Sequence, residues 1–180
     1  MPVSPDLLIV EDGSIVADAN SYITYDYAEN YHALRGNSAW AAGDPSEKQY
    51  AIIRATQAVD SIYKGQWEGS QTEYGTQELE WPRQNVWVGD VEIADDTIPT
   101  ALKKAVCEAA LRELASPNSM MPDLDRGGKI KRVKADTVEV EYSEGASSTT
   151  SFTAIDGLLV DLIAGASADG LASYDIELGG

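Results

Sequence analysis

Few residues in this chain could take part in catalysis. Among 180 residues there is one histidine, His32, and one cysteine, Cys107. His32 has Glu29 three residues before it, as a general base with an acidic neighbour would, but no serine or cysteine lies in a nucleophile-elbow context. We therefore predict that His32 has a surface or packing role. Cys107 lies among alanines and valine, the setting of a buried and inert thiol. The sequence predicts that the protein is not an enzyme.

Motifs for metals and nucleotides are incomplete. A single cysteine excludes both a thiolate zinc site and an intrachain disulfide. Asp123, Asp125 and Gly127 resemble the start of a calcium loop, but the later oxygen ligands and the closing glutamate are missing, so a structured turn is the preferred interpretation. No glycine-rich segment has the pattern of a phosphate loop or of a dinucleotide site. We expect neither a metal nor a cofactor.

Charge is the most unusual property of the sequence. Thirteen Lys and Arg oppose thirty Asp and Glu, which gives a net charge of −17. Such a surface repels polyanions, so the composition disfavours a general nucleic-acid binder. Four of the thirteen basic residues fall within positions 129–134. We interpret this run as a strand with a basic face that meets an acidic protein partner, in preference to a phosphate contact.

Targeting and membrane signals are not evident. The first six residues contain no Lys or Arg, unlike a secretory signal or a transit peptide. No stretch approaches the roughly 18 consecutive apolar residues that span a bilayer. We expect a protein that is made in the cytoplasm and does not enter a membrane.

Helical periodicity predicts three helices before Pro117. The first covers residues 24–35, with Tyr27, Ala28, Tyr31 and Leu34 on its apolar face and a stop at Gly36. The second begins at Asp44 as N-cap, followed by Pro45 and by Glu47 in a capping-box position. The third begins near residue 98 and is rich in alanine, which permits close helix approach.

The remaining segments predict a small β part. Apolar residues 7–10 and 15–17 around an Asp-Gly pair predict an N-terminal hairpin within residues 1–18. Residues 137–142 alternate as a strand whose expected partner is 151–153, and a short helix is expected over 155–164.

The fold class is therefore mainly α with a small β part. It has three regions: the N-terminal hairpin extension (1–18), a helical-bundle core (19–117) and a hinge with an extended C-terminal arm and tail (118–180). The core includes a long ordered loop over 64–97, which holds three of the four tryptophans.

Several short motifs, in this order, are similar to those of a tailed-phage protein family described as DnaT-like single-stranded-DNA-binding proteins. The motifs are Asn20-Ser21-Tyr22, Tyr31-His32, Arg35-Gly36-Asn37, Ala39-Trp40, Ile53-Arg54-Ala55-Thr56, Leu79-x-Trp81-Pro82-Arg83, Ile98-Pro99-x-Ala101-Leu102-Lys103 and Pro122-Asp123-Leu124-Asp125-Arg126-Gly127-Gly128. The resemblance covers about residues 18 to 160. The helical core and genomic role of that family resemble those of head-tail connector (adaptor) proteins.

The resemblance implies a structural protein of the virion neck. It would form a homo-oligomeric ring, twelve-fold in related connectors, that docks under the portal protein, extends the DNA channel and offers a platform to tail, stopper or tail-terminator proteins. Packaged DNA would pass along its acidic walls without specific binding. The alternative is a single-stranded-DNA-binding protein of phage replication, which needs a basic groove and exposed stacking aromatics.

Partner contacts, not catalytic residues, are the expected functional groups. They comprise two sets, one in the hinge and arm for the portal or the neighbouring subunit, and one in the long loop: Arg126, Lys129, Lys131, Arg132, Lys134 and Tyr142 in the arm, and Trp81 and Arg83 in the loop. For Trp81 and Arg83, a second interpretation is an anchor of the loop inside one subunit.

Overall fold

The computed structural model describes residues 7–121, 133–135, 138–140 and 152–165 of the chain, and these are mainly helical with a small β part, as predicted. The helices are α1 (Tyr25–Ala33), α2 (Ser38–Ala41), α3 (Pro45–Tyr63), α4 (Thr100–Ala115) and α5 (Thr153–Leu159), the last followed by the 3-10 turn η1 (Val160–Leu162). The strands are β1 (Ser70–Gln71), β2 (Arg83–Gln84), β3 (Val86–Val88), β4 (Val91–Ile93), β5 (Val133–Ala135) and β6 (Val138–Val140).

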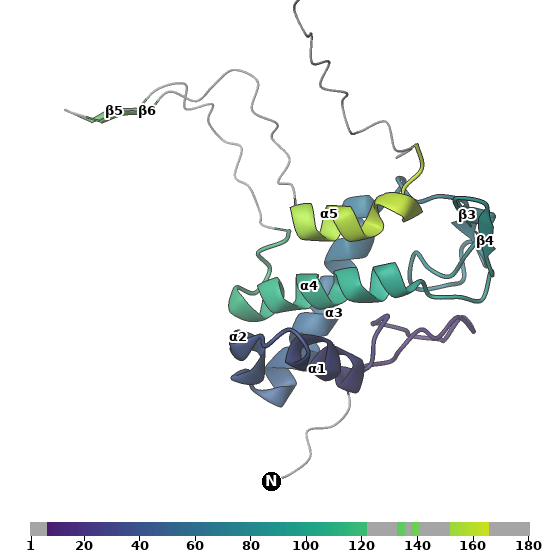
Figure 1. Cartoon of the computed structure of the whole chain (residues 1–180), viewed down its shortest axis with the longest axis horizontal. Helices are drawn as coiled ribbons and strands as arrows, with labels where there is room; N and C mark the ends of the chain where they lie inside the picture. Colours follow the sequence, from purple (N-terminus) through teal and green to yellow (C-terminus); the bar gives the residue numbers. More distant parts are fainter. Residues whose placement is uncertain (1–6, 122–132, 136–137, 141–151, 166–180) are drawn as a thin grey trace, which may run out of the picture.

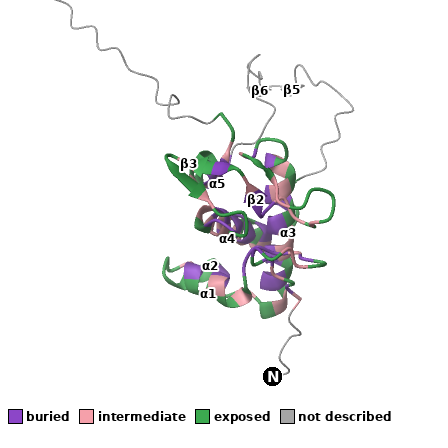
Figure 2. Cartoon of the chain, turned by 90° about the vertical axis from the view of Figure 1, so that its right-hand side faces the viewer, coloured by how far each residue is buried: buried purple, intermediate pink, exposed green. Residues whose placement is uncertain are grey.

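Helices α3 and α4 form the centre of the core. Small side chains on both helices are fully buried, among them Ala51 and Ala55 on α3 and Ala105 and Ala109 on α4. Because alanine projects little beyond the backbone, the two helices can approach closely. Figure 1 shows α4 crossing α3, with α5 on one side of α4 and the short helices α1 and α2 on the other. Buried residues therefore gather between the helices, as the purple segments in Figure 2 show.

Local capping signals account for where the helices begin. The Asp44 carboxylate accepts a hydrogen bond of 2.8 Å from the Ser46 N–H at the start of α3, which confirms the predicted N-cap. At α1 the Thr24 hydroxyl oxygen accepts from the Tyr27 N–H at 3.1 Å. The predicted apolar face of α1 is wrong at Leu34, which is 78% exposed, because the helix ends one residue earlier.

The predicted N-terminal hairpin is wrong. Val10 instead forms a parallel bridge with Ser21. The buried carboxylate of Glu11 accepts three backbone hydrogen bonds, from Gly13 at 2.8 Å, from Ile15 at 3.0 Å and from Val16 at 2.9 Å. The Glu11 side chain thus accepts the N–H hydrogen bonds that pairing of the two expected strands would have used, so the segment forms a loop.

The C-terminal helix belongs to the core and not to the expected arm. Its buried residues Phe152, Ile155 and Leu159 pack into the same cluster as α3 and α4. The Tyr63 hydroxyl at the end of α3 donates a hydrogen bond to the Asp156 carboxylate. The expected boundary between core and arm at residue 118 is therefore wrong for α5, which follows that boundary in sequence but packs in the core.

The predicted partner of the strand over 137–142 is also wrong. β6 pairs antiparallel with β5, with Val133 opposite Val140 and Lys134 opposite Glu139. Of the segment expected to pair with it, residue 151 lies outside the described residues, and Phe152 and Thr153 are the N-cap and the first residue of α5. A strand pairs more readily with its neighbour in sequence, because that pairing closes a shorter loop.

No helix within the described part of the chain combines the length and the apolarity that a bilayer crossing requires.

A buried carboxylate fixes the C-terminal end of α4. Glu113 is 1% exposed, and its oxygens accept from the N–H groups of Asn118 at 2.6 Å and Met120 at 3.0 Å. The guanidinium of Arg54 on α3 forms an ion pair of 3.1 Å with the same side chain. One residue therefore joins α3, α4 and the turn after α4.

We predict that Glu113→Ala lowers the free energy of unfolding by about 2–4 kcal/mol, because it leaves two backbone donors and one cation without their acceptor. Glu73→Ala, at an exposed loop carboxylate, should change it by less than about 0.5 kcal/mol. Urea unfolding followed by circular dichroism measures both. Equal effects of the two substitutions would contradict the role given to Glu113.

Candidate functional site

The segment between α3 and α4, residues 64–99, forms one end of the molecule, and we call it the tryptophan loop. It contains Trp67, Trp81 and Trp87 and the strand pairs β1–β2 and β3–β4 (Figure 1). The sequence predicts a long ordered loop over 64–97, and the structure places four short strands within it. Its inner side is an anchor and its outer side is an exposed hairpin.

The inner side is held by buried aromatic rings and a hydrogen-bond relay. The Trp67 and Trp81 rings pack edge to face with centroids 5.9 Å apart, and both are buried. The backbone N–H of Trp81 donates to the Tyr22 hydroxyl oxygen at 3.1 Å, and that hydroxyl donates to the Asp60 carboxylate at 2.7 Å. The relay links the loop, the N-terminal segment and α3. Burial raises the pKa of Asp60 to about 7.

Arg83 is a second internal anchor. Its guanidinium donates to the carbonyl oxygens of Glu68 at 2.9 Å, Gly69 at 3.0 Å and Glu80 at 3.1 Å, and forms an ion pair of 3.3 Å with the Glu80 carboxylate. Burial lowers the pKa of Arg83, while the neighbouring Glu80 opposes that shift. Trp81 and Arg83 are both buried. Of the two interpretations of these residues, the structure favours the anchor inside one subunit.

The other predicted contact residues are in the arm. Arg126, Lys129, Lys131, Arg132 and Tyr142 lie outside the described residues. The backbone of the remaining one, Lys134, lies on β5 opposite Glu139. The structure therefore brings none of them into a described site.

His32 and Cys107 occupy packing positions, as predicted. The buried His32 ring lies against Trp40, with centroids 4.3 Å apart, and its Nδ1 is 2.8 Å from the Asn37 amide nitrogen. Burial lowers the pKa of His32 and raises the pKa of Cys107 to about 12. A thiol with such a pKa stays protonated near neutral pH and is a poor nucleophile.

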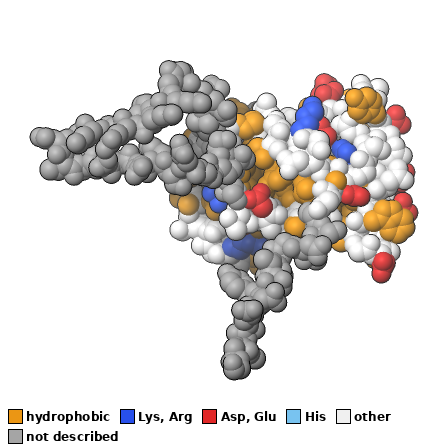
Figure 3. Space-filling model, turned by 90° about the horizontal axis from the view of Figure 1, so that it is seen from above, with side chains coloured by type: hydrophobic (Ala, Val, Ile, Leu, Met, Phe, Trp, Pro, Cys, Tyr) orange, Lys and Arg blue, Asp and Glu red, His pale blue; other side chains and the backbone are white. Residues whose placement is uncertain are grey.

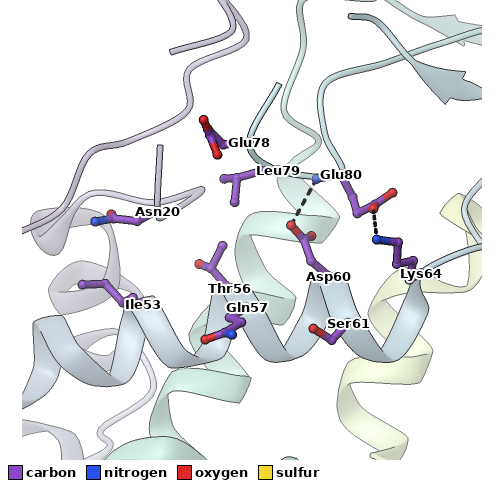
Figure 4. A pocket seen from close by; sticks show the side chains of 10 residues that line it. All are labelled: Asn20, Ile53, Thr56, Gln57, Asp60, Ser61, Lys64, Glu78, Leu79 and Glu80. Carbon is purple, nitrogen blue, oxygen red and sulfur yellow. Dashed lines mark hydrogen bonds and ion pairs between the residues drawn. The ribbon is translucent and has the colours of Figure 1, made fainter. Parts of the chain in front are cut away.

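A cavity of about 330 Å³ lies between α3 and residues 78–80, and Asp60 of the relay lines it (Figure 4). Its polar lining includes Asp60, Lys64 and Glu80. The Asp60 carboxylate already accepts from Tyr22 and from the Glu80 N–H at 3.1 Å, and Lys64 pairs with the Glu80 carboxylate at 3.9 Å. Among the described residues, no group of three or more His, Cys, Asp or Glu is placed to hold a metal ion. Asp60, Lys64 and Glu80 are therefore engaged in internal contacts, whereas the buried Thr56 hydroxyl, which also lines the cavity, has no hydrogen-bond partner among the described residues.

The outer side of the loop is the β3–β4 hairpin. Trp87 lies opposite Glu92 and Val88 opposite Val91, across a two-residue turn of Gly89 and Asp90. Trp87 is 52% exposed and Val91 69% exposed. The prediction of a loop without regular periodicity over 64–97 misses this hairpin. A signal for it is present in the sequence, because alternating apolar residues flank the Gly-Asp pair.

Acidic residues surround the exposed apolar ones. The turn over 72–76 carries Tyr74, which is 88% exposed, and the Thr72 hydroxyl donates to the Asp95 carbonyl oxygen at 2.8 Å, which holds this turn beside the end of β4. We call the resulting surface the acidic aromatic face; it comprises Tyr74, Trp87, Val91, Glu73, Asp90, Glu92 and Asp95. Figure 3 shows hydrophobic and acidic side chains side by side at this end of the molecule.

The cations of the described chain are largely committed to internal pairs. Residues 65–99 contain eight acidic residues and one basic residue, the buried Arg83. Of the eight basic residues within 7–121, five form ion pairs: Arg35 with Glu108, Lys48 with Glu29, Arg54 with Glu113, and both Lys64 and Arg83 with Glu80. The others are Lys103, Lys104 and Arg112, all on α4. Residues 7–121 therefore lack the basic groove that tracks a nucleic-acid backbone.

A sequence profile described as “Putative DnaT-like ssDNA binding protein” matches residues 7–176 of the chain. Neither the curated proteins nor the solved structures contain a significant match to the chain.

The two kinds of tryptophan should respond differently to truncation. We predict that Trp81→Ala lowers the free energy of unfolding by about 3–5 kcal/mol, because it empties a buried site and loosens the relay. Trp87→Ala should lower it by less than about 1 kcal/mol, because half of this side chain is already in water. Urea denaturation of both variants tests this, and similar losses would show that Trp87 is a second anchor.

The raised pKa of Asp60 predicts a dependence of stability on pH. The folded protein holds the Asp60 proton up to about pH 7, whereas the unfolded chain releases it near 3.8. This contribution to stability is complete below about pH 4, falls as the pH rises to 7 and is then constant.

The free energy of unfolding of the wild type, measured relative to that of Asp60→Asn, should therefore fall as the pH rises from 4 to 7. Urea unfolding at a series of pH values measures this difference, and a constant difference for Asp60→Asn would refute the assignment.

Proposed function

We propose that this chain, which belongs to the family described as “Putative DnaT-like ssDNA binding protein”, is a structural virion protein. In this role it is the adaptor that forms a ring below the portal protein, extends the DNA channel and provides the platform to which the tail attaches. It is made in the host cytoplasm and resides in the neck of the virion. It has no enzymatic activity.

The observation that carries this proposal is the acidic aromatic face. Exposed aromatic and aliphatic side chains beside charged ones are typical of a protein-binding surface, because the apolar groups supply the burial and the charges select the partner. Trp87 and Val91 supply the apolar groups, and Asp90 and Glu92 supply the charge. An oligomeric ring docked between a portal and a tail needs surfaces of this kind.

The charge balance supports a channel wall better than a DNA-binding groove. The described residues from 7 to 121 carry eighteen acidic and eight basic residues, and five of the basic ones are paired internally. DNA held at such a wall feels repulsion and can slide without sticking. A ring of this composition suits the passage of DNA during packaging and ejection.

The second candidate is a single-stranded-DNA-binding protein of phage replication, which the family description favours. The exposed rings of Tyr74 and Trp87 could stack on bases. Their neighbours Glu73 and Glu92 oppose the approach of phosphates, however, and the basic run over 129–134 would have to supply the whole electrostatic attraction. We therefore rank this function second.

Binding to the two partners separates the candidates. We predict that the full-length protein mixed with the portal ring of its own virus forms a complex that electron microscopy shows as an added ring. Trp87→Ala should weaken that complex, and Tyr50→Ala, an exposed aromatic on α3, should not. In parallel, fluorescence anisotropy with a labelled oligonucleotide at near-physiological salt should show weak binding. Sub-micromolar binding that falls steeply with salt, without a portal complex, would establish the DNA-binding alternative instead.

A further inference from the structure

The acidic aromatic face has no partner among the described residues. β3 and β4 form a sheet of two strands, and the outward-facing Trp87 and Glu92 lie opposite each other on it. Tyr74 adds exposed aromatic surface on the turn over 72–76, and Val91, next to Glu92 in the strand, exposes apolar surface on the other face of the hairpin. In water this arrangement leaves large apolar side chains hydrated next to carboxylates, so it suits a partner that is both apolar and basic.

One segment of the same chain has that chemistry. Residues 129–134 read Lys, Ile, Lys, Arg, Val, Lys, with four cations around two β-branched apolar residues. Elsewhere the chain has nine basic residues and thirty acidic ones. Cations from the segment can pair with Asp90 and Glu92 and can lie over the Trp87 ring, and its apolar residues can pack beside the same ring.

The two surfaces belong to opposite ends of α4. The acidic aromatic face precedes the N-terminal end of this helix, since β4 ends at Ile93 and α4 begins at Thr100. Met121 lies beyond the C-terminal end of α4, and β5, which contains the last two residues of the basic segment, lies on the opposite side of the molecule from β3 and β4 (Figure 1). A helix of sixteen residues separates these ends by about 24 Å. Complementary surfaces at opposite ends of a subunit produce head-to-tail contacts, the kind that close a ring.

We infer that the basic segment of residues 129–134 in one subunit binds the acidic aromatic face of a second copy of this chain. This contact identifies a partner for the surface on which the proposed function rests, and it defines the direction in which subunits follow one another. The bound segment neutralises carboxylates of the face and covers Trp87.

Crosslinking between two distinguishable copies tests the contact. One copy carries Glu92→Cys and a size tag, and the other carries Lys131→Cys; Cys107 is buried and stays unmodified. After mixing and treatment with a short bismaleimide, we expect a covalent heterodimer in several-fold higher yield than from a control copy with Tyr50→Cys on the exposed surface of α3. A single chain with both Glu92→Cys and Lys131→Cys should give a ladder of multimers.

Charge reversal then tests the specificity of the contact. Asp90→Lys with Asp95→Lys in the Glu92→Cys copy should lower the yield, as should Lys129→Glu with Arg132→Glu in the Lys131→Cys copy. Combining the two reversed copies should restore it, because the charges are again complementary. A variant that fails to fold would not be restored, so the rescue separates loss of contact from loss of structure.

Two results would overturn the inference: a yield no higher than that of the Tyr50→Cys control, or crosslinks formed only within one chain. Portal binding is scored in a separate experiment. Crosslinked multimers without a portal complex would refute the adaptor function and leave this contact standing. A portal complex without the crosslink would refute this contact and leave the adaptor function standing.

Discussion

The relay from the backbone N–H of Trp81 through the Tyr22 hydroxyl to Asp60 is the interaction on which the arrangement of the loop depends. The tryptophan loop has only four short strands, and ordering so long a connection costs conformational entropy at every residue. The relay and the guanidinium of Arg83 fix the loop from inside, against α3 and against its own backbone. The exposed hairpin keeps a defined position because these buried groups hold its base.

The distribution of charge follows from the same division between inside and outside. Most cations of the described core pair with carboxylates at short range, so the negative charge that remains is concentrated on exposed surfaces. Within residues 65–99, this leaves an outer surface with carboxylates and no exposed cation. A surface of this composition favours partners that combine cations with apolar groups, because charge and apolar contact then act together.

Features with a local cause could be predicted from the sequence, and features with a distant cause could not. The start of α3 was predictable because Asp44 and Pro45 act on their immediate neighbours. The loop around Glu11 was not, because a hairpin pattern gives no sign that a buried carboxylate will replace the second strand. Burial likewise separates Trp81 from Trp87, and their neighbours in sequence suggest the opposite, since the exposed Trp87 lies between two valines and the buried Trp81 follows a glutamate. The contact residues expected over 126–142 stay predictions, apart from the backbone position of Lys134.

The packing of α5 against α4 has a consequence for how this family can diversify. Met120 and Phe152 are both buried in the core, and the guanidinium of Arg112 near the end of α4 lies 5.6 Å from the Phe152 ring. The chain thus departs from and rejoins the core at one place, so the intervening segment is closed at its base. Doubling the length of such a segment adds only about 0.6 kcal/mol of closure entropy. Insertions, deletions and even a grafted reporter domain are therefore compatible with an unchanged helical core, so the length and sequence of this stretch can change independently of the core.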